Sequence, residues 1–360
     1  MNGAGEHGGV PAASGVPVVL LGSGSFAVAP FSAVRAAAPE LGLHVACVVS
    51  QPDRRAGRGQ ALSPTPVSAW ALAHGLPLER TDDASSGSAL ARIRGIQPAL
   101  MVVVAFGQRL GRELLDGAAA VNLHGSLLPA WRGAAPIQRS LMAGDVRVGV
   151  TVIGIADRID AGAAFAEAAT EPRDAETAGE LHDRLSVLGC APLLDTVRRW
   201  RGAFDAHQNT PLRQRAVRAL DSLGGVQQDE RLVTRAAKLS RADAWVDFAA
   251  DAHAVSARIN GLSPWPGVDA VVGQNALRIL RARPASEGDT ARASAGGAHA
   301  GEITSAGRVA CGRGMVELLE VQPPGGSVMA CDAFRRGRQI AAGAVIRCPA
   351  MAAKGSDPSP

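Results

Sequence analysis

The sequence predicts a chain of two domains, an α/β domain with a mostly parallel sheet followed by a small β-barrel. The first half repeats short apolar runs separated by helical segments, which is typical of a parallel sheet covered by helices. Beyond about residue 265 the pattern changes to short alternating strands with turn residues between them, which favours a barrel. The length of 360 residues also exceeds what one ordinary domain requires.

The composition excludes several classes of protein. The chain is 47% hydrophobic, yet no stretch approaches the roughly 18 consecutive apolar residues of a membrane span. Residues 1–15 lack the basic start and apolar centre of a secretory signal and are predicted to be a disordered tail. The five cysteines are far apart, without metal-ligand or redox spacing, which indicates a reduced, cytoplasmic setting. A net charge of +4 permits a nucleic-acid partner without requiring one.

A glycine-rich turn follows the first predicted strand, Val16–Leu21. The turn, G-S-G-S-F-A at Gly22–Ala27, precedes a helix to about Ala37. It matches the G-x-G-x-x-A fingerprint of dinucleotide-binding enzymes, so an NAD-dependent enzyme is the first alternative. The second strand, His44–Ser50, ends without the acidic residue that would bind the ribose. We therefore interpret the glycines as a tight turn between strand and helix.

Polar residues collect at the ends of two later strands. In the strand Ala118–His124, Asn122 and His124 alternate with apolar residues and so share one face near the carboxyl end, where open α/β sheets bind ligands. Asp160 follows another apolar strand, Gly149–Ile155, and could close on the same crevice. An amide, an imidazole and a carboxylate together can stabilise a tetrahedral oxyanion and move a proton. The alternative is a histidine that is only hydrogen-bonded for structure.

The remaining elements complete the α/β domain. Helices are expected at about Pro66–His74 and Ala89–Arg94, and an outer strand at Ala163–Ala168. The capping box T-A-G-E at Thr177–Glu180 begins a helix whose apolar face extends to Val197, with a kink allowed at Pro192. Another helix is expected to begin at Pro136, because proline suits a first helical turn.

The segment from Asn122 to Gln138 reads N-L-H-G-S-L-L-P-A-W-R-G-A-A-P-I-Q. Together with D-A-G at Asp160–Gly162, it resembles the methionyl-tRNA formyltransferase family. The Asn, His, S-L-L-P and Asp are shared with a wider superfamily that includes glycinamide ribonucleotide formyltransferase, whereas W-R-G-A-A-P-I-Q is narrower. The resemblance covers about Val16–Arg338 and implies a Rossmann-like amino domain and an OB-like carboxyl domain.

The resemblance also implies a reaction. The α-amine of methionine on initiator tRNA would attack the formyl carbon of 10-formyltetrahydrofolate, with no metal. Asn122 and His124 would stabilise the oxyanion. Asp160 would orient His124 and assist proton transfer to the leaving folate nitrogen. The pterin would lie near Val103–Phe106. The other residues expected to contact the folate are Ser126, Leu127, Leu128 and Pro129.

An arginine-rich stretch, Q-P-D-R-R-A-G-R-G at Gln51–Gly59, has no hydrophobic periodicity. It is predicted to be an exposed, mobile loop whose positive charge suits phosphates. It resembles the insertion with which the family engages the acceptor end of initiator tRNA. Arg58 matches the main family position, and Arg54 and Arg55 are expected to contribute. The stretch departs from the family at Arg55, where proline is frequent. The alternative is a loop that is merely solvated.

The carboxyl-terminal half sets the predicted domain limits. Trp265 in L-S-P-W-P-G, a motif that resembles a family signature, is expected to be a buried plug at the domain seam rather than a stacking platform. The low-complexity segment 284–299 is predicted to be a disordered barrel loop. The predicted parts are a disordered tail at 1–15, the formyltransferase catalytic domain at 16–206, a linker at 207–229, the OB-like tRNA-binding domain at 230–348, and a disordered tail at 349–360. Within the linker, Ala216–Leu223 could form a short helical turn.

The sequence therefore predicts a cytoplasmic enzyme, expected to be a monomer without a membrane span, with methionyl initiator tRNA and folate as its partners. A formyltransferase acting on a sugar nucleotide or another small amine would share the three catalytic residues but should lack the arginine-rich stretch. An RNA-binding protein without catalysis would not need all three.

Overall fold

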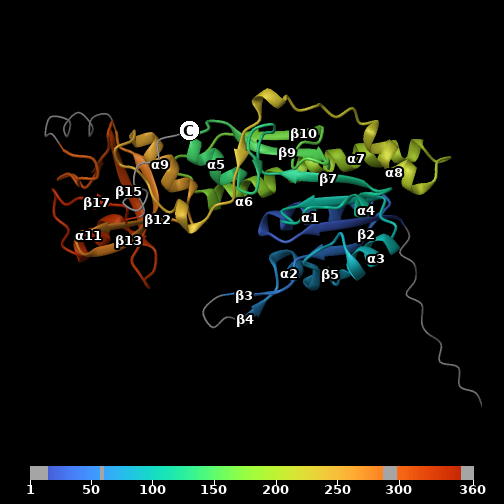
Figure 1. Ribbon diagram of the computed structural model, residues 1–360, viewed down its shortest axis with the longest axis horizontal. Helices are drawn as coiled ribbons and strands as arrows, with labels where there is room; N and C mark the ends of the chain where they lie inside the picture. Colours follow the sequence, from blue (N-terminus) through green and yellow to red (C-terminus); the bar gives the residue numbers. More distant parts are fainter. Residues whose placement is uncertain (1–14, 57–60, 287–297, 350–360) are drawn as a thin grey trace, which may run out of the picture.

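The computed structural model describes residues 15–56, 61–286 and 298–349. Figure 1 shows the α/β domain at one end of the molecule and the barrel at the other, with α5 and α9 between them. Several predictions lie outside the described residues. They are the tails, apart from Gly15 and Pro349, most of the 284–299 insert, and Arg58.

A seven-stranded sheet forms the centre of the amino-terminal domain, in the order β10-β9-β7-β6-β1-β2-β5. Neighbouring strands pair in parallel, except that β9 runs antiparallel to both β7 and β10. All five residues of β6 are buried, which explains its continuous apolar sequence. The predicted Rossmann-like sheet is confirmed. Its strands are β1 (Val16–Gly22), β2 (Leu43–Ser50), β5 (Leu78–Arg80), β6 (Leu100–Val104), β7 (Ala119–His124), β9 (Val148–Gly154) and β10 (Ala164–Thr170).

The glycine-rich turn packs against its own domain. A Cβ on Gly22 would lie 2.7 Å from the carbonyl oxygen of Val104, so only glycine fits there. The amides of Ser23 and Gly24 both donate to the carbonyl oxygen of Ala105, at 3.2 and 3.1 Å. Ser50, at the end of β2, shares a 2.6 Å hydrogen bond with the Thr65 hydroxyl. These contacts fit the predicted tight turn between strand and helix.

Helices cover the sheet, and two of them differ from the prediction. The capping box forms, because Thr177 Oγ1 accepts the amide of Glu180 at 3.3 Å and the Glu180 carboxylate accepts the amide of Thr177 at 2.9 Å. The single helix expected beyond it is two helices that meet at Gly189. Pro192 lies in the first turn of the second, where its missing N–H has no helical partner to lose. The helices are α1 (Val28–Ala37), α2 (Pro66–Ala73), α3 (Gly87–Gly95), α4 (Arg112–Leu115), α5 (Pro136–Ala143), α6 (Ala178–Leu188), α7 (Cys190–Ala206) and α8 (Leu212–Asp221).

Helix α8 lies within the stretch predicted as a linker, and it packs on the catalytic domain. Ala216 and Ala219 are fully buried, and the Trp200 indole on α7 donates to the carbonyl oxygen of Ala216 at 3.1 Å. Leu220 also packs against the core. The helix begins earlier than the short turn that the sequence allowed at Ala216–Leu223, because its first residues are mostly polar and exposed. The limits 207 and 229 stay predictions.

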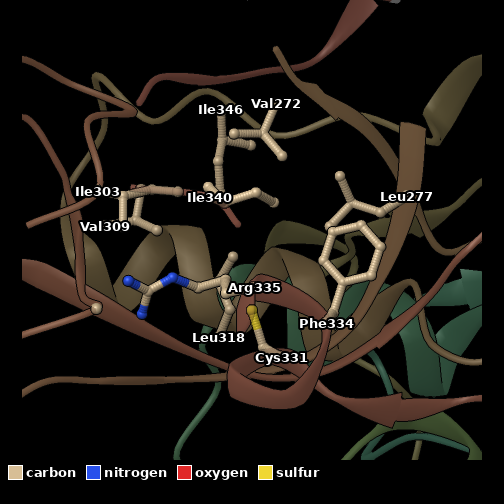
Figure 2. Close-up of a pocket in the computed structure, with 11 residues that line it drawn as sticks. Val272, Leu277, Ile303, Val309, Leu318, Cys331, Phe334, Arg335, Ile340 and Ile346 are labelled. Atoms are coloured by element: carbon tan, nitrogen blue, oxygen red, sulfur yellow. The ribbon is translucent and has the colours of Figure 1, made fainter. Parts of the chain in front are cut away.

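The carboxyl-terminal domain is a nearly closed, barrel-like antiparallel sheet in the order β14-β15-β13-β12-β17, with β16 on β15. Figure 2 shows its interior, where Phe334 and Cys331 meet side chains from the facing strands, among them Leu277 and Val272. The predicted barrel is therefore confirmed. Its elements are α9 (Ala252–Gly261), β12 (Val268–Val272), β13 (Asn275–Pro284), β14 (Val309–Ala310), β15 (Met315–Gln322), β16 (Met329–Ala330), α11 (Cys331–Gly337) and β17 (Ile346–Arg347).

The seam between the domains corrects one prediction. Trp265 is not a buried plug, since 49% of its surface is exposed. Ser263, which is buried, and Pro264, which is exposed, contact helix α6 at this seam. The amide of Gly179 donates to Ser263 at 3.1 Å, and a Cβ on Gly179 would lie 2.8 Å from the Pro264 ring.

An ion pair also crosses the seam. The Arg281 guanidinium on β13 contacts both Glu180 carboxylate oxygens, at 2.9 and 2.8 Å, and donates to the carbonyl oxygen of Ala175 at 3.0 Å. It lowers the pKa of Glu180 to about 2. Arg281 thus ties the barrel to the first turn of α6.

Candidate active site

Two of the three predicted catalytic residues meet at the carboxyl end of β7. His124 is its last residue, and Asp160 lies in the turn after β9; their Nδ1 and Oδ2 atoms are 3.7 Å apart. Both side chains are largely buried, with 7% and 14% of their surfaces exposed. Asn122 lies two residues before His124, partly buried and on the same face of the strand. The structure therefore brings His124 and Asp160 together and places Asn122 on the same strand as His124, and the catalytic roles of the three stay predictions.

The His124 ring is held on both sides. Its Nε2 atom lies 2.9 Å from the carbonyl oxygen of Trp131. Because a carbonyl oxygen only accepts, Nε2 is the donor in that bond. Nδ1 faces the Asp160 oxygen that also accepts the amide of Gly133, at 2.9 Å. A protonated ring would satisfy the carbonyl and the carboxylate together, so the arrangement suits a histidine that carries a proton during reaction.

Two residues beside this ring have an unfavourable backbone conformation. Trp131 and Asp160 have φ angles of 65° and 53°, in the left-handed region that residues other than glycine rarely adopt. Trp131 is held by its neighbours: its amide donates to the Thr234 hydroxyl at 2.9 Å, and its indole donates to Asp145 at 2.7 Å. These bonds direct the Trp131 carbonyl oxygen at His124. Backbone strain that neighbouring groups enforce is common where a site needs fixed geometry.

The segment between the domains also packs against the site. β8 (Arg132–Gly133) pairs in parallel with β11 (Arg235–Ala236), which lies in the predicted second domain. The Arg132 guanidinium is buried, with 4% of its surface exposed, and donates to Gln228 and Glu230. Its bond to Glu230 holds the pKa of that carboxyl below its usual range.

The sequence analysis missed the roles of Gln228, Arg132, Trp131 and Thr234. Gln228 lies in a polar stretch without periodicity, interpreted as a linker, so no pattern marked it. The narrow W-R-G motif was a usable signal for Trp131 and Arg132, since a buried arginine beside a catalytic strand needs a polar partner.

The predicted folate loop, Ser126–Pro129, is tied to β9 by Thr151. The Thr151 hydroxyl donates to the carbonyl oxygen of Ser126 at 2.8 Å and accepts the amide of Leu128 at 3.0 Å. The buried Ser126 hydroxyl donates to the carbonyl oxygen of Ala130 at 2.6 Å. Ser126 therefore shapes the loop, while Leu127, Leu128 and Pro129 are partly exposed.

The arginine-rich stretch corrects another expectation. Residues Arg54–Ala56 of the stretch form a strand, β3, which pairs antiparallel with β4 (Ala61–Ser63) just beyond it. We call these two strands the arginine ribbon. Figure 1 shows the ribbon projecting from the α/β domain. Its arms pair with each other rather than with the core, so no face is buried and no hydrophobic period appears.

The base of the ribbon is linked to the crevice. Arg54 and Arg55 are both exposed, and Arg54 donates to Gln51 at 3.0 Å. Gln51 in turn donates to the carbonyl oxygen of Phe106, just beyond β6, at 2.9 Å. The structure thus carries both described arginines on an element anchored beside the predicted pterin position.

In residues 15–56, 61–286 and 298–349, no group of three or more His, Cys, Asp or Glu side chains could hold a metal ion. No helix in that part of the chain is long and apolar enough to cross a membrane.

Known proteins resemble this chain in sequence and in fold. Family models match it over residues 16–197, as a formyl transferase, and over 238–339, as a formyl transferase carboxyl-terminal domain. The methionyl-tRNA formyltransferase of Roseobacter denitrificans is 38% identical over 332 residues, which cover 92% of this chain and 98% of that protein.

Two solved structures share the fold at low identity. HypX from Aquifex aeolicus, in complex with tetrahydrofolic acid, has a TM-score of 0.53 at 13% identity and covers 88% of this chain and 46% of its own. An N-formyltransferase from Helicobacter canadensis, in complex with folinic acid and dTDP-3-aminofucose, has a TM-score of 0.56 at 11% identity and covers 86% and 98%.

The Roseobacter relative and the two structural neighbours differ in sequence identity to this chain. The structural neighbours show the fold alone, whereas the Roseobacter relative matches both domains without a large gap in coverage. The chain therefore belongs to the methionyl-tRNA formyltransferase family.

Proposed function

We propose that this protein transfers the formyl group of 10-formyltetrahydrofolate to the α-amino group of methionine on initiator tRNA, with Asn122, His124 and Asp160 as its catalytic residues. One observation carries the proposal. His124 and Asp160 are both largely buried and lie 3.7 Å apart, in a chain that is 38% identical to a methionyl-tRNA formyltransferase over 92% of its length.

The crevice can support acyl transfer. The amine forms a bond to the formyl carbon, and the carbonyl oxygen becomes an oxyanion that the Asn122 amide and the His124 ring stabilise by donating hydrogen bonds. An oxyanion is a stronger acceptor than the neutral Trp131 carbonyl oxygen that His124 Nε2 contacts in this structure, so the ring can exchange one partner for the other. Asp160 stabilises the charged ring and assists the proton from the amine to the leaving N10 nitrogen, as the C–N10 bond breaks.

The loop after β7 fits the donor. Leu127, Leu128 and Pro129 leave part of their surface exposed beside His124, on a loop whose shape Thr151 fixes. The folates in the structures of HypX and of the Helicobacter enzyme favour a folate-derived donor for a chain of the same fold. The formamide at N10 is already an activated acyl group, so no metal is required.

The arginine ribbon fits the acceptor. Arg54 and Arg55 bring two positive charges to one projecting element, and Arg58 adds a third to the same stretch of sequence; this charge suits the phosphates of an acceptor stem. We also propose that the domain at 230–348 helps to bind the tRNA, and that the enzyme is a monomer in the cytoplasm.

A second candidate is transfer to an amino sugar on a nucleotide. The Helicobacter neighbour favours it, since its structure holds dTDP-3-aminofucose. That likeness has 11% identity, against 38% for the methionyl-tRNA enzyme.

A transfer assay decides between the acceptors. The enzyme is given labelled 10-formyltetrahydrofolate and either methionyl initiator tRNA or a dTDP-amino sugar. We expect label in acid-precipitable tRNA, with the slow Asp160→Asn variant as the control. Label in the sugar and none in the tRNA would contradict the proposal.

A further inference from the structure

Gln228 lies between the two domains in sequence, and its side chain reaches the catalytic crevice. We propose that Gln228 is a positioning residue that holds the Asp160 turn in its working geometry. The inference rests on the proposed function, because it concerns how the same trio is kept in place.

The carboxamide of Gln228 uses its full hydrogen-bonding capacity. Its Nε2 atom donates to the carbonyl oxygens of Asp160 and Gly162, at 2.8 and 2.7 Å. Its Oε1 atom accepts two bonds from Arg132, at 2.9 and 2.8 Å. The opposite amide orientation would set an oxygen against two carbonyls and an NH₂ group against a guanidinium. The four partners therefore fix which atom is which.

The strained backbone of the Asp160 turn has to be stabilised by contacts from outside the turn. Asp160 has a left-handed backbone, with φ at 53°, and the turn lies close to β9: a Cβ on Gly162 would be 1.7 Å from the carbonyl oxygen of Gly154. A turn under such strain persists only where its surroundings enforce it. Gln228 binds the carbonyl on each side of Ala161, and so sets the direction in which the Asp160 carboxylate leaves the turn.

The same amide also reaches the elements around His124. Arg132 follows Trp131, whose carbonyl oxygen contacts His124, and it precedes Gly133, whose amide contacts the Asp160 carboxylate. Gln228 thus joins the backbone that holds the imidazole to the backbone that holds the carboxylate. Its loss should shift one relative to the other, without removing any group that touches a substrate.

The test replaces Gln228 by leucine, which is similar in size but cannot form hydrogen bonds. We expect kcat to fall about 10-fold or more, since a shift of about 1 Å in a reacting group can cost on the order of 10²-fold. The KM values for tRNA and for the folate donor should stay within about twofold of wild type. Gln227→Leu is the matched control, because Gln227 is the adjacent residue of the same type and is exposed. Its kcat should equal that of wild type.

Gln228→Glu separates positioning from simple pairing of the buried Arg132. Glutamate keeps acceptors for the guanidinium, so it also covers the case in which the leucine variant fails to fold. It places a carboxylate oxygen against the carbonyls of Asp160 and Gly162, and should lose as much kcat as leucine does. Full activity with glutamate would mean that Gln228 only satisfies Arg132, which would overturn the proposal.

A double-mutant cycle shows whether Gln228 acts through Asp160. In the Asp160→Asn background, Gln228→Leu should lower kcat by less than threefold, because the group that it positions is already disabled. An undiminished effect in that background, or a Gln228→Leu enzyme with wild-type kcat, would overturn the proposal. Each kcat is compared with that of wild type on whichever acceptor the wild-type enzyme formylates. The test of Gln228 therefore stays valid even if that acceptor is not initiator tRNA.

Discussion

The catalytic crevice and the arginine ribbon are built in opposite ways. In the crevice, the buried His124 and Asp160 each have protein partners, and two residues have strained backbones. The described arms of the ribbon bury neither face, and Arg54 and Arg55 are exposed. Acyl transfer needs groups fixed to within a fraction of an ångström, whereas attraction to a polyanion needs charge and reach. The comparison predicts that crevice variants lose kcat and that ribbon variants lose tRNA affinity.

The largest effects are expected in the crevice. Replacing His124 or Asn122 by alanine should lower kcat by roughly 10²-fold or more, because each change removes a donor to the oxyanion. Folate binding, measured by equilibrium titration, should change much less. Wild-type kcat in either variant, with a normal melting temperature, would remove that residue from the mechanism.

A smaller loss of kcat is expected at Asp145, which acts on His124 through Trp131. Asp145→Ala removes the acceptor for the Trp131 indole at 2.7 Å and loosens the carbonyl oxygen that contacts His124. We expect a fall in kcat of several-fold, up to about 10-fold, with tRNA KM unchanged. Steady-state kinetics check this, and an increase in tRNA KM at constant kcat would assign Asp145 to binding instead.

The ribbon should give the converse result. Arg58→Leu should raise the KM for charged tRNA, with Arg54→Leu and Arg55→Leu having smaller effects. Each phosphate contact that is lost should flatten the slope of log affinity against log salt by up to about one unit. Arg198→Leu is the control, because Arg198 is an exposed arginine on α7, away from the ribbon. If Arg58→Leu leaves both KM and salt slope unaltered, the ribbon is merely solvated.

The smallest effect is expected at the seam between the domains. Arg281 holds the pKa of Glu180 near 2, below the ordinary 4.5. A lowered acid pKa stabilises the folded state above about pH 4.5, and this stability is lost as pH falls toward 2. Glu180 is 49% exposed, so the contribution should be about 1 kcal/mol or less.

Arg281→Leu should therefore lower the melting temperature slightly at pH 7, and the difference from wild type should shrink between pH 4.5 and 2. Arg278→Leu is a control on the same strand, since Arg278 pairs with Asp269 of β12 within the barrel, at 2.9 Å. A difference between Arg281→Leu and wild type that grows on acidification would contradict the assignment.

The elements with a periodic apolar pattern could be predicted from the sequence. The features that depend on individual tertiary contacts could not. Apolar runs located the inner strands, and alternation placed Asn122 and His124 on one face, because both follow from burial. The predictions that Trp265 is buried and that the arginine-rich stretch has no regular structure were wrong, because neither feature depends on a periodic pattern. Ser263 and Pro264 contact α6 at the seam, and β3 pairs with β4.

The support around the trio was hidden for a related reason. Gln228 is 68 residues from Asp160 in the sequence. No local sequence pattern predicts that a side-chain amide binds carbonyl groups so far away along the chain. Such contacts follow from tertiary packing, which brings the segment between the domains against the crevice.

The central claim is that the His124–Asp160 pair drives formyl transfer to tRNA. Single-turnover transfer to methionyl initiator tRNA, with enzyme and folate donor saturating, tests it most directly. The account predicts that Asp160→Asn, which keeps the shape of the side chain but removes its charge, stays at least about 10²-fold slower than wild type at every tRNA concentration. A wild-type single-turnover rate for folded Asp160→Asn would contradict the claim.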